Sequence, residues 1–366
     1  MALEIIDKKI VGNINNLQEK LEGKIPVDIL ELIHLVNSWG RSNKIIIFQS
    51  NKQIEIDNCE ATQSEQTFYQ NATSNPLLVK KFVRKECYDL SKLDTSQITD
   101  MRDLFSCSQF NGDISSWDVS GVTSMDSMFY RAEKFNSDIG NWNVSKVTSM
   151  TRLFNGATIF NQDISKWDVS NVNSFSNIFN GAQNFNQNLN SWNVSNVTNM
   201  SNMFYFAKSF NQPLNNWNVS NVENMNYMFC GAKMFNQDIN SWDVSNVKII
   251  NGFFQDTINF NQPLNNWDIS NVVSISHIFK NAKAFNQNIS NWNLDKLEFF
   301  EEAFYEAKAF ENKYNSGKPL PNKIEDIKDW FNLNRDKMNM IDVKDKHGTE
   351  IDNFFSNFSK INNINR

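Results

Sequence analysis

Few residues in this chain could act as catalytic bases. Three histidines occur among 366 residues, at His34, His277 and His347. His34 lies in an apolar stretch, His277 in a variable repeat position, and His347 in a polar Lys-Asp-Lys-His-Gly turn. None stands at a recognised motif spacing from a Cys or Ser nucleophile, and no P-loop, GxGxxG or HExxH motif occurs. We therefore expect a protein that is not an enzyme and needs no cofactor.

A column of oxygen-bearing side chains raises the separate question of metal binding. Some β-helix repeats hold Ca²⁺ on stacked oxygens, but their loops are rich in glycine and dense in carboxylates. Half of this column is neutral Asn, and the whole chain has only 12 glycines. We expect a column of hydrogen bonds and no metal site. Its members are Asp118, Asn143, Asp168, Asn193, Asn218, Asp243, Asp268 and Asn293.

The elements that must position these side chains are repeats of 25 residues. A fixed period of this length is the signature of a solenoid, in which each unit packs only on its neighbours. Phe recurs with the same period, from Phe110 to Phe310. The predicted structural core is the tryptophan column Trp117, Trp142, Trp167, Trp192, Trp217, Trp242, Trp267 and Trp292.

The apolar positions inside one unit predict its shape. Ile114, Trp117 and Val119 follow the L-x-x-L-x-L spacing of a leucine-rich-repeat strand. The apolar residues over 122–135 then recur every three to four positions, which is typical of a short helical segment. We therefore expect a leucine-rich-repeat-like solenoid with a short strand, a bend at Ser120 and one or two helical turns in each coil.

Two polar columns run beside the apolar ones. Asn recurs every 25 residues from Asn111 to Asn286, and Gln follows it in each copy from Gln162 to Gln287. Stacked amides can donate and accept hydrogen bonds from coil to coil, which would pair backbone groups that packing removes from water. We expect these columns to be structural.

Comparing the copies with each other shows which positions vary. The strand side hardly changes, whereas positions on the expected helical side do, including the columns of Tyr227 and His277 and of Tyr205 and Lys280. Tyr205, Phe206, Tyr227 and Met234 lie in adjacent copies and are the candidate partner-binding residues, because exposed aromatic patches mark binding surfaces. The alternative is neutral drift at solvated positions.

The repeat string is Phe-Asn-Gln-Asp-Ile-Ser-x-Trp-Asp-Val-Ser-Asn-Val-x-x-Met-x-x-Met-Phe-x-Gly-Ala, and residues 160–182 and 235–247 match it well. It resembles the BspA-like leucine-rich-repeat surface-protein family of bacterial surface lipoproteins. The lead-in over 77–86 is similar to that family's N-terminal cap helix. The resemblance covers about 76–310 and implies a solenoid fold with a role in adhesion or protein binding. It supplies no catalytic residues.

The chain divides into three parts on this basis. Residues 1–75 lack the repeat and predict a small α+β segment, with a helix from Pro26 to about Gly40 and a hairpin of 45–48 with 54–56. Residues 76–310 form the solenoid of about nine coils. Residues 311–366 begin with a linker and continue into two expected helices, one containing 324–331 and one starting at Thr349.

Composition narrows the function further. A net charge of −6 without a basic cluster argues against nucleic acid, and no apolar run is long enough for a membrane span. We expect a noncatalytic scaffold that binds a protein or a host-cell or cell-surface ligand. The alternative is a targeting module for a toxin-related or hydrolytic activity in a flanking segment. The missing signal peptide favours a cytoplasmic location, whereas the family resemblance favours a surface or secreted one.

Overall fold

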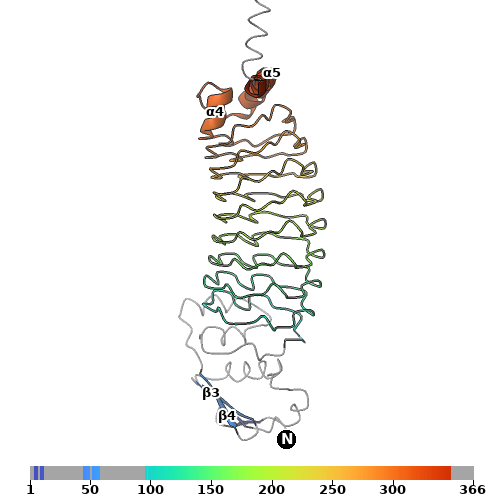
Figure 1. The fold of residues 1–366 in the computed structure, drawn as a ribbon, viewed down its shortest axis with the longest axis vertical. Helices are drawn as coiled ribbons and strands as arrows, with labels where there is room; N and C mark the ends of the chain where they lie inside the picture. The colour runs from blue at the N-terminus through green and yellow to red at the C-terminus, as the bar shows by residue number, and fades with distance from the viewer. Residues whose placement is uncertain are drawn as a thin grey trace, which may run out of the picture.

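The computed structural model describes residues 4–6, 9–11, 44–49, 52–57, 95–96 and 98–347. Its main body is a tall stack of coils, each one repeat long, with helices at the C-terminal end (Figure 1). Near the N-terminus, β1 (Glu4–Ile6) pairs with β2 (Lys9–Val11), and β3 (Lys44–Gln49) pairs with β4 (Lys52–Asp57), both antiparallel. The second pair is the predicted hairpin. The helices expected over 26–40 and 77–86 lie outside the described residues.

The interior of the stack is filled by aromatic columns. The eight repeat tryptophans are all buried, with at most 4% of their surface exposed. Equivalent rings stack face to face along the axis, for example Trp117 on Trp142 at 6.4 Å and Phe160 on Phe185 at 6.0 Å between centroids. Offset stacked pairs of this kind add to the free energy gained from burial itself. The coils therefore share one continuous core.

The predicted strand and helical segment are both wrong in detail. Residues 114–119 form no strand, and the coils are joined instead by single-residue parallel bridges such as Asp100 with Ser124. The stretch expected to be helical is a chain of tight turns, because Ser127 (φ 56°) and Arg131 (φ 52°) adopt left-handed conformations that interrupt any helix. Its Asn and Ser content, unfavourable for helices, agrees with this outcome.

We call residues 125–132 and their equivalents in other coils the turn ladder. Every second N–H along it, at 125, 127, 129 and 131, donates to a carbonyl of the next coil, at 149, 151, 153 and 155. The intervening N–H groups, at 128, 130 and 132, close local turns on 125, 127 and 129. These seven backbone donors are therefore all paired, four of them between coils, which explains why turns replace a helix here.

The amide columns connect coils as predicted. The side-chain oxygen of Asn186 accepts the N–H of Asn211 at 2.9 Å, and Asn211 does the same for Asn236 at 2.9 Å. The tryptophans add a parallel series, in which the indole N–H of Trp217 donates to the carbonyl of Leu189 at 2.8 Å. Each such bond contributes about 1 kcal/mol, and leaving a buried partner unpaired costs more.

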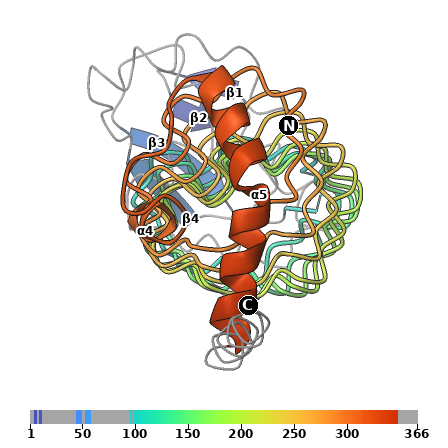
Figure 2. The ribbon, with the colours of Figure 1, turned by 90° about the horizontal axis from the view of Figure 1, so that it is seen from above.

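Two helices close the C-terminal end. Helix α4 (Lys308–Tyr314) continues directly from the last coil, and α5 (Ile324–His347) lies across the end of the stack (Figure 2). Ile327, Phe331 and Met338 of α5 are buried against the core. The expected helix containing 324–331 corresponds to the start of α5, and the one from Thr349 lies outside the described residues. No helix in the described part is long and apolar enough to cross a membrane.

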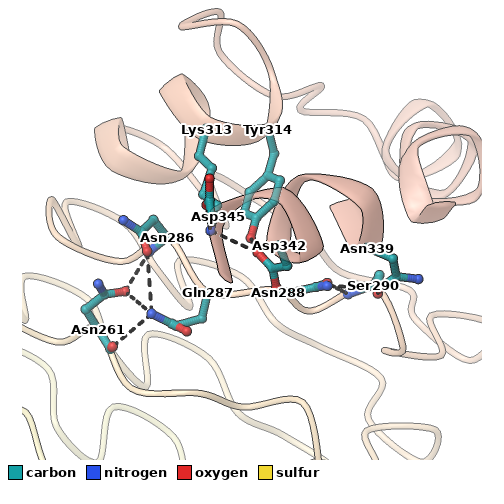
Figure 3. Close-up of polar contacts among 10 residues, drawn as sticks. All are labelled: Asn261, Asn286, Gln287, Asn288, Ser290, Lys313, Tyr314, Asn339, Asp342 and Asp345. Atoms are coloured by element: carbon teal, nitrogen blue, oxygen red, sulfur yellow. Dashed lines mark hydrogen bonds and ion pairs between the residues drawn. The ribbon is translucent and has the colours of Figure 1, made fainter. Parts of the chain in front are cut away.

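Polar contacts hold α5 in place (Figure 3). The side-chain oxygen of Asn339 accepts hydrogen bonds from Asn288 at 2.9 Å and Ser290 at 2.7 Å. Asp342 accepts from the Lys313 ammonium at 2.9 Å and the Tyr314 hydroxyl at 2.8 Å, which ties α5 to α4. Burial alone would lower the pKa of Lys313, but its hydrogen bonds to Asp342 and Asp345 raise that pKa.

Candidate partner-binding surface

The structure brings three of the four candidate residues together on the turn ladder. The Tyr205 ring meets Phe206 edge to face at 4.7 Å between centroids and Tyr227 at 6.3 Å. All three side chains are half-buried rather than freely exposed. Edge-to-face pairs of this kind hold rings in fixed orientations. The result is a small aromatic cluster that spans two neighbouring coils.

Met234 does not join this cluster. Its side chain is 52% exposed, and its sulfur accepts a hydrogen bond from Asn259 of the next coil at 3.8 Å. It lies past the end of the turn ladder, two residues beyond Ala232, and it is not among the residues that line the hollow beside Tyr205 and Tyr227. The hollow therefore does not include Met234, since closeness in sequence does not fix which side of a coil a residue occupies.

Two of the aromatic residues occupy strained backbone positions. Phe206 has φ 52° and Tyr227 has φ 54°, in the left-handed region that bulky residues rarely adopt. Equivalent positions in neighbouring copies hold Gly, Asn, Asp or Ser more often, which suit this conformation better. Strain of about 1–3 kcal/mol persists only where the surrounding structure imposes it, and such positions concentrate at functional sites.

The coil that follows each ring supplies a glycine to make room for it. A Cβ on Gly231 would lie 2.7 Å from the Phe206 ring, and one on Gly252 would lie 2.2 Å from the Tyr227 ring. Gly231 occupies the same repeat position as Phe206, and Gly252 the same position as Tyr227. Each ring therefore lies flat over the next coil, in space that any larger residue would fill.

A shallow hollow of about 400 Å³ extends from the aromatic rings along the stack axis. We call its lining residues, together with Phe206, the turn-face patch. Gly252 leaves a gap in the column between Tyr227 and His277. The lining residues are Asn202, Tyr205, Tyr227, Gln255, His277 and Lys280.

The far end of the turn-face patch carries charge. Lys280 forms an ion pair with Glu302 of the next coil, and His277 lies 3.4 Å from the same carboxylate. The hydrogen bond between Lys280 and Glu302 raises the pKa of Lys280 and lowers the pKa of Glu302, so both stay charged at neutral pH. One side of the hollow is thus aromatic and the other is charged.

The turn-face patch has no reactive nucleophile. Cys230 is adjacent in the Tyr205 column but is only 2% exposed, and burial raises the pKa of its thiol to about 12. A thiol in that state is protonated at neutral pH and is a poor nucleophile. Burial also raises the pKa of the Tyr205 hydroxyl, which therefore remains a neutral hydrogen-bonding group.

The Asp and Asn column considered for metal binding is used locally. The side-chain oxygen of Asp168 accepts the N–H of Ser170 at 3.1 Å, and Asn193 does the same for Ser195 at 3.2 Å. These are turns within one coil rather than a column of bonds between coils. Hydrogen bonds from Ser170 lower the pKa of Asp168. Within 98–347 no cluster of three His, Cys, Asp or Glu side chains is placed to hold a metal ion.

The sequence comparison overlooked the glycines and the polar wall of the patch. Gln255, His277 and Lys280 are separated from Tyr205 by up to three repeats, and stacking brings them to one hollow. Gly231 and Gly252 could have been found by asking which residue follows each aromatic one repeat later. That question requires knowing that equivalent positions lie directly above one another.

Comparison with known proteins identifies one family. A family model described as "Mycoplasma protein of unknown function, DUF285" matches four overlapping stretches, at 63–174, 138–238, 214–317 and 235–344. The matches together cover the whole stack of coils and most of α5. No curated protein and no solved structure matches the chain.

Proposed function

We propose that this chain, which belongs to the DUF285 family, is a noncatalytic scaffold that binds a protein partner through the turn-face patch. The stacked coils would act as a rigid support, since solenoids present extended surfaces made from equivalent positions of successive repeats. The resemblance to BspA-like surface proteins supports a role in adhesion within this proposal.

One observation carries the proposal. Phe206 and Tyr227 take left-handed backbone positions at a cost to folding, and glycines one repeat later receive their rings. Folding alone would favour Asn or Gly at both positions, and seven of the sixteen equivalent positions in the other coils have one of these residues. Neither residue belongs to the buried core, so core packing does not account for the backbone strain at these two positions. A role of the two rings in binding does account for it.

The chemistry of the patch favours a protein partner. Tyr is enriched among the few residues that carry most of the binding energy at protein interfaces, and it combines apolar area with a hydroxyl that forms hydrogen bonds. Gln255 and Asn202 offer amide donors and acceptors for a peptide backbone, and Lys280 offers a charge at the rim. The net charge of −6 also fits a protein partner better than nucleic acid.

The test uses two triple variants of the full chain. Y205A/F206N/Y227N removes the aromatic cluster, and Asn preserves the left-handed positions. Y130A/R131N/R152N changes the equivalent positions three repeats earlier and serves as the matched control. Proteins captured from cell and host-cell extracts by immobilised chain are quantified by mass spectrometry, and retained proteins are purified and titrated directly.

We expect a partner that binds the wild type and the control with similar affinity. Its affinity for the patch variant should fall about thirtyfold or more, as when a hot-spot cluster is removed. If every directly binding protein tolerates the patch variant as well as the control variant, the turn-face patch is not the binding surface.

A further inference from the structure

The last coil of the stack leaves its turn ladder open. The N–H groups of Phe300, Glu302, Phe304 and Glu306 are equivalent to those that pair with a following coil elsewhere, as the N–H of Phe279 does with Ala303. No hydrogen bond to any of these four N–H groups occurs within the described residues. They form a row of donors with the spacing of a strand edge, which favours pairing with another segment.

The space beside this open edge is not filled by the helical cap. A hollow of about 320 Å³ lies between the edge and the Pro319–Asn322 segment that leads into α5, with Leu320 on its opposite wall. Large apolar side chains are exposed at the same end of the molecule. Phe299 is 58% exposed and Tyr305 53%, and on α5 Leu333 is 82% and Met340 66% exposed.

The sequence after α5 contains a further copy of the turn-ladder pattern. Residues 351–358 read Ile-Asp-Asn-Phe-Phe-Ser-Asn-Phe, and residues 250–257 of the stack read Ile-Asn-Gly-Phe-Phe-Gln-Asp-Thr. The apolar residues agree at the first, fourth and fifth positions, including the Phe that is fifth in every coil from Phe129 to Phe304, whereas at the eighth position Phe358 stands where the coils have Ala or Thr257. Asn353 and Asn357 fall where the stack requires left-handed residues, as Gly252 and Asp256 do.

The last described residues of α5 lie well away from the open edge of the same molecule. Phe331 of α5 lies beside Phe304, with ring centroids 6.2 Å apart, so the start of α5 is near the edge. From Phe331 to His347 the helix advances about 24 Å away from it. The four residue steps from His347 to Ile351 span at most about 14 Å.

We propose that residues 351–358 add to the open turn ladder of a second copy of this chain. The carbonyls of Glu350, Asp352, Phe354 and Ser356 would accept these four N–H groups, which have no acceptor within the described residues, in the register that joins the coils of the stack. When two molecules exchange these segments reciprocally, both edges are filled and the pair closes into a twofold dimer. The exposed apolar residues of the last coil and α5 lie at the same end and would be covered.

The apolar spacing of 351–358 also fits a helix, and two substitutions separate the arrangements. Val strongly disfavours a left-handed backbone and Gly tolerates it, whereas in a helix Gly is the more damaging of the two. The test therefore compares N353V/N357V with N353G/N357G in the full chain. F354D/F355D, which removes two apolar contacts, provides a third variant.

Sedimentation velocity over a range of micromolar concentrations measures the dimer dissociation constant, and amide exchange reports on Phe300, Glu302, Phe304 and Glu306. We expect a wild-type dimer in which these four amides are protected. N353V/N357V should raise the dissociation constant about thirtyfold or more, and N353G/N357G should leave it within about threefold. F354D/F355D should yield a monomer with the same far-ultraviolet circular dichroism and exposed edge amides.

Three results would overturn the proposal. One is a wild-type chain that stays monomeric, whether its edge amides are exposed or are protected by its own tail. Another is a dimer that the glycine variant weakens more than the valine variant. The third is a dimer in which the four edge amides exchange as fast as in F354D/F355D.

Discussion

The substitution G252A tests directly whether the Tyr227 ring packs against Gly252 of the next coil. The added methyl would lie 2.2 Å from Cδ1 and 2.3 Å from Cε1 of Tyr227, well inside contact distance, so the ring must leave its place. Gly252 also has φ +56°, where Ala costs about 1–2 kcal/mol more than Gly. Displacing the ring loses its edge contact with Tyr205, which adds about 0.5–1.5 kcal/mol.

The chain offers a matched control at Gly181. This glycine has φ +70°, but a Cβ there would meet only Gly156 at 3.6 Å, an ordinary contact. G181A therefore isolates the backbone penalty of about 1–2 kcal/mol. G252A should lower the free energy of unfolding by about 0.5–1.5 kcal/mol more than G181A does.

Equilibrium urea unfolding followed by tryptophan fluorescence measures both costs, since the indole column is buried throughout the stack. In a Y227N background, where no ring packs against residue 252, G252A should lower the free energy of unfolding by no more than G181A does. Equal costs of G252A and G181A in the wild-type background would refute the close packing of Tyr227 on Gly252, and with it the argument that the ring position is built into the fold.

Three further predictions follow from the same contacts. N211A removes the acceptor for the N–H of Asn236 and should lower the free energy of unfolding by about 1–3 kcal/mol; a loss below 0.5 kcal/mol in urea unfolding would mean that the amide column is dispensable. The Cys230 pKa of about 12 lies above that of an unfolded thiol, so the folded state binds the extra proton; stability should fall as pH rises above about 9, and C230A should flatten that dependence in thermal unfolding. D342A removes one of the two carboxylates that pair with Lys313, leaving Asp345, and also removes the acceptor for the Tyr314 hydroxyl; it should speed amide exchange in the second half of α5, while exchange in the coils stays unchanged.

The stack and its core were predictable because they depend on a repeated chemistry. When Trp and Phe recur every 25 residues, only stacking of equivalent positions buries all of them at once. The Asn and Gln columns follow from the same logic, since identical amides placed above one another can pair. The hairpin of β3 and β4 was predictable from two short β-branched runs with a turn between them.

The conformation of the turn ladder was decided by contacts between coils. The spacing of Met125, Met128, Phe129 and Ala132 suits a helix, and the Asn and Ser content of the stretch disfavours one without specifying the alternative. Stacking offers each second N–H a carbonyl of the next coil, and the left-handed residues at 127 and 131 turn those groups toward it. A helix would have used the same donors internally and left neighbouring coils unconnected along this side.

The turn-face patch shows the same division. The sequence by itself determined that Tyr205, Phe206 and Tyr227 stand at positions free to vary, and that the tryptophans do not. Only the tertiary structure decided that His277 and Lys280 share a hollow with Tyr205 and Tyr227, and that Met234 does not line it. The reason is geometric. Stacking makes residues that are 25 positions apart in the sequence direct neighbours, whereas two residues only a few positions apart can lie on different sides of the same coil.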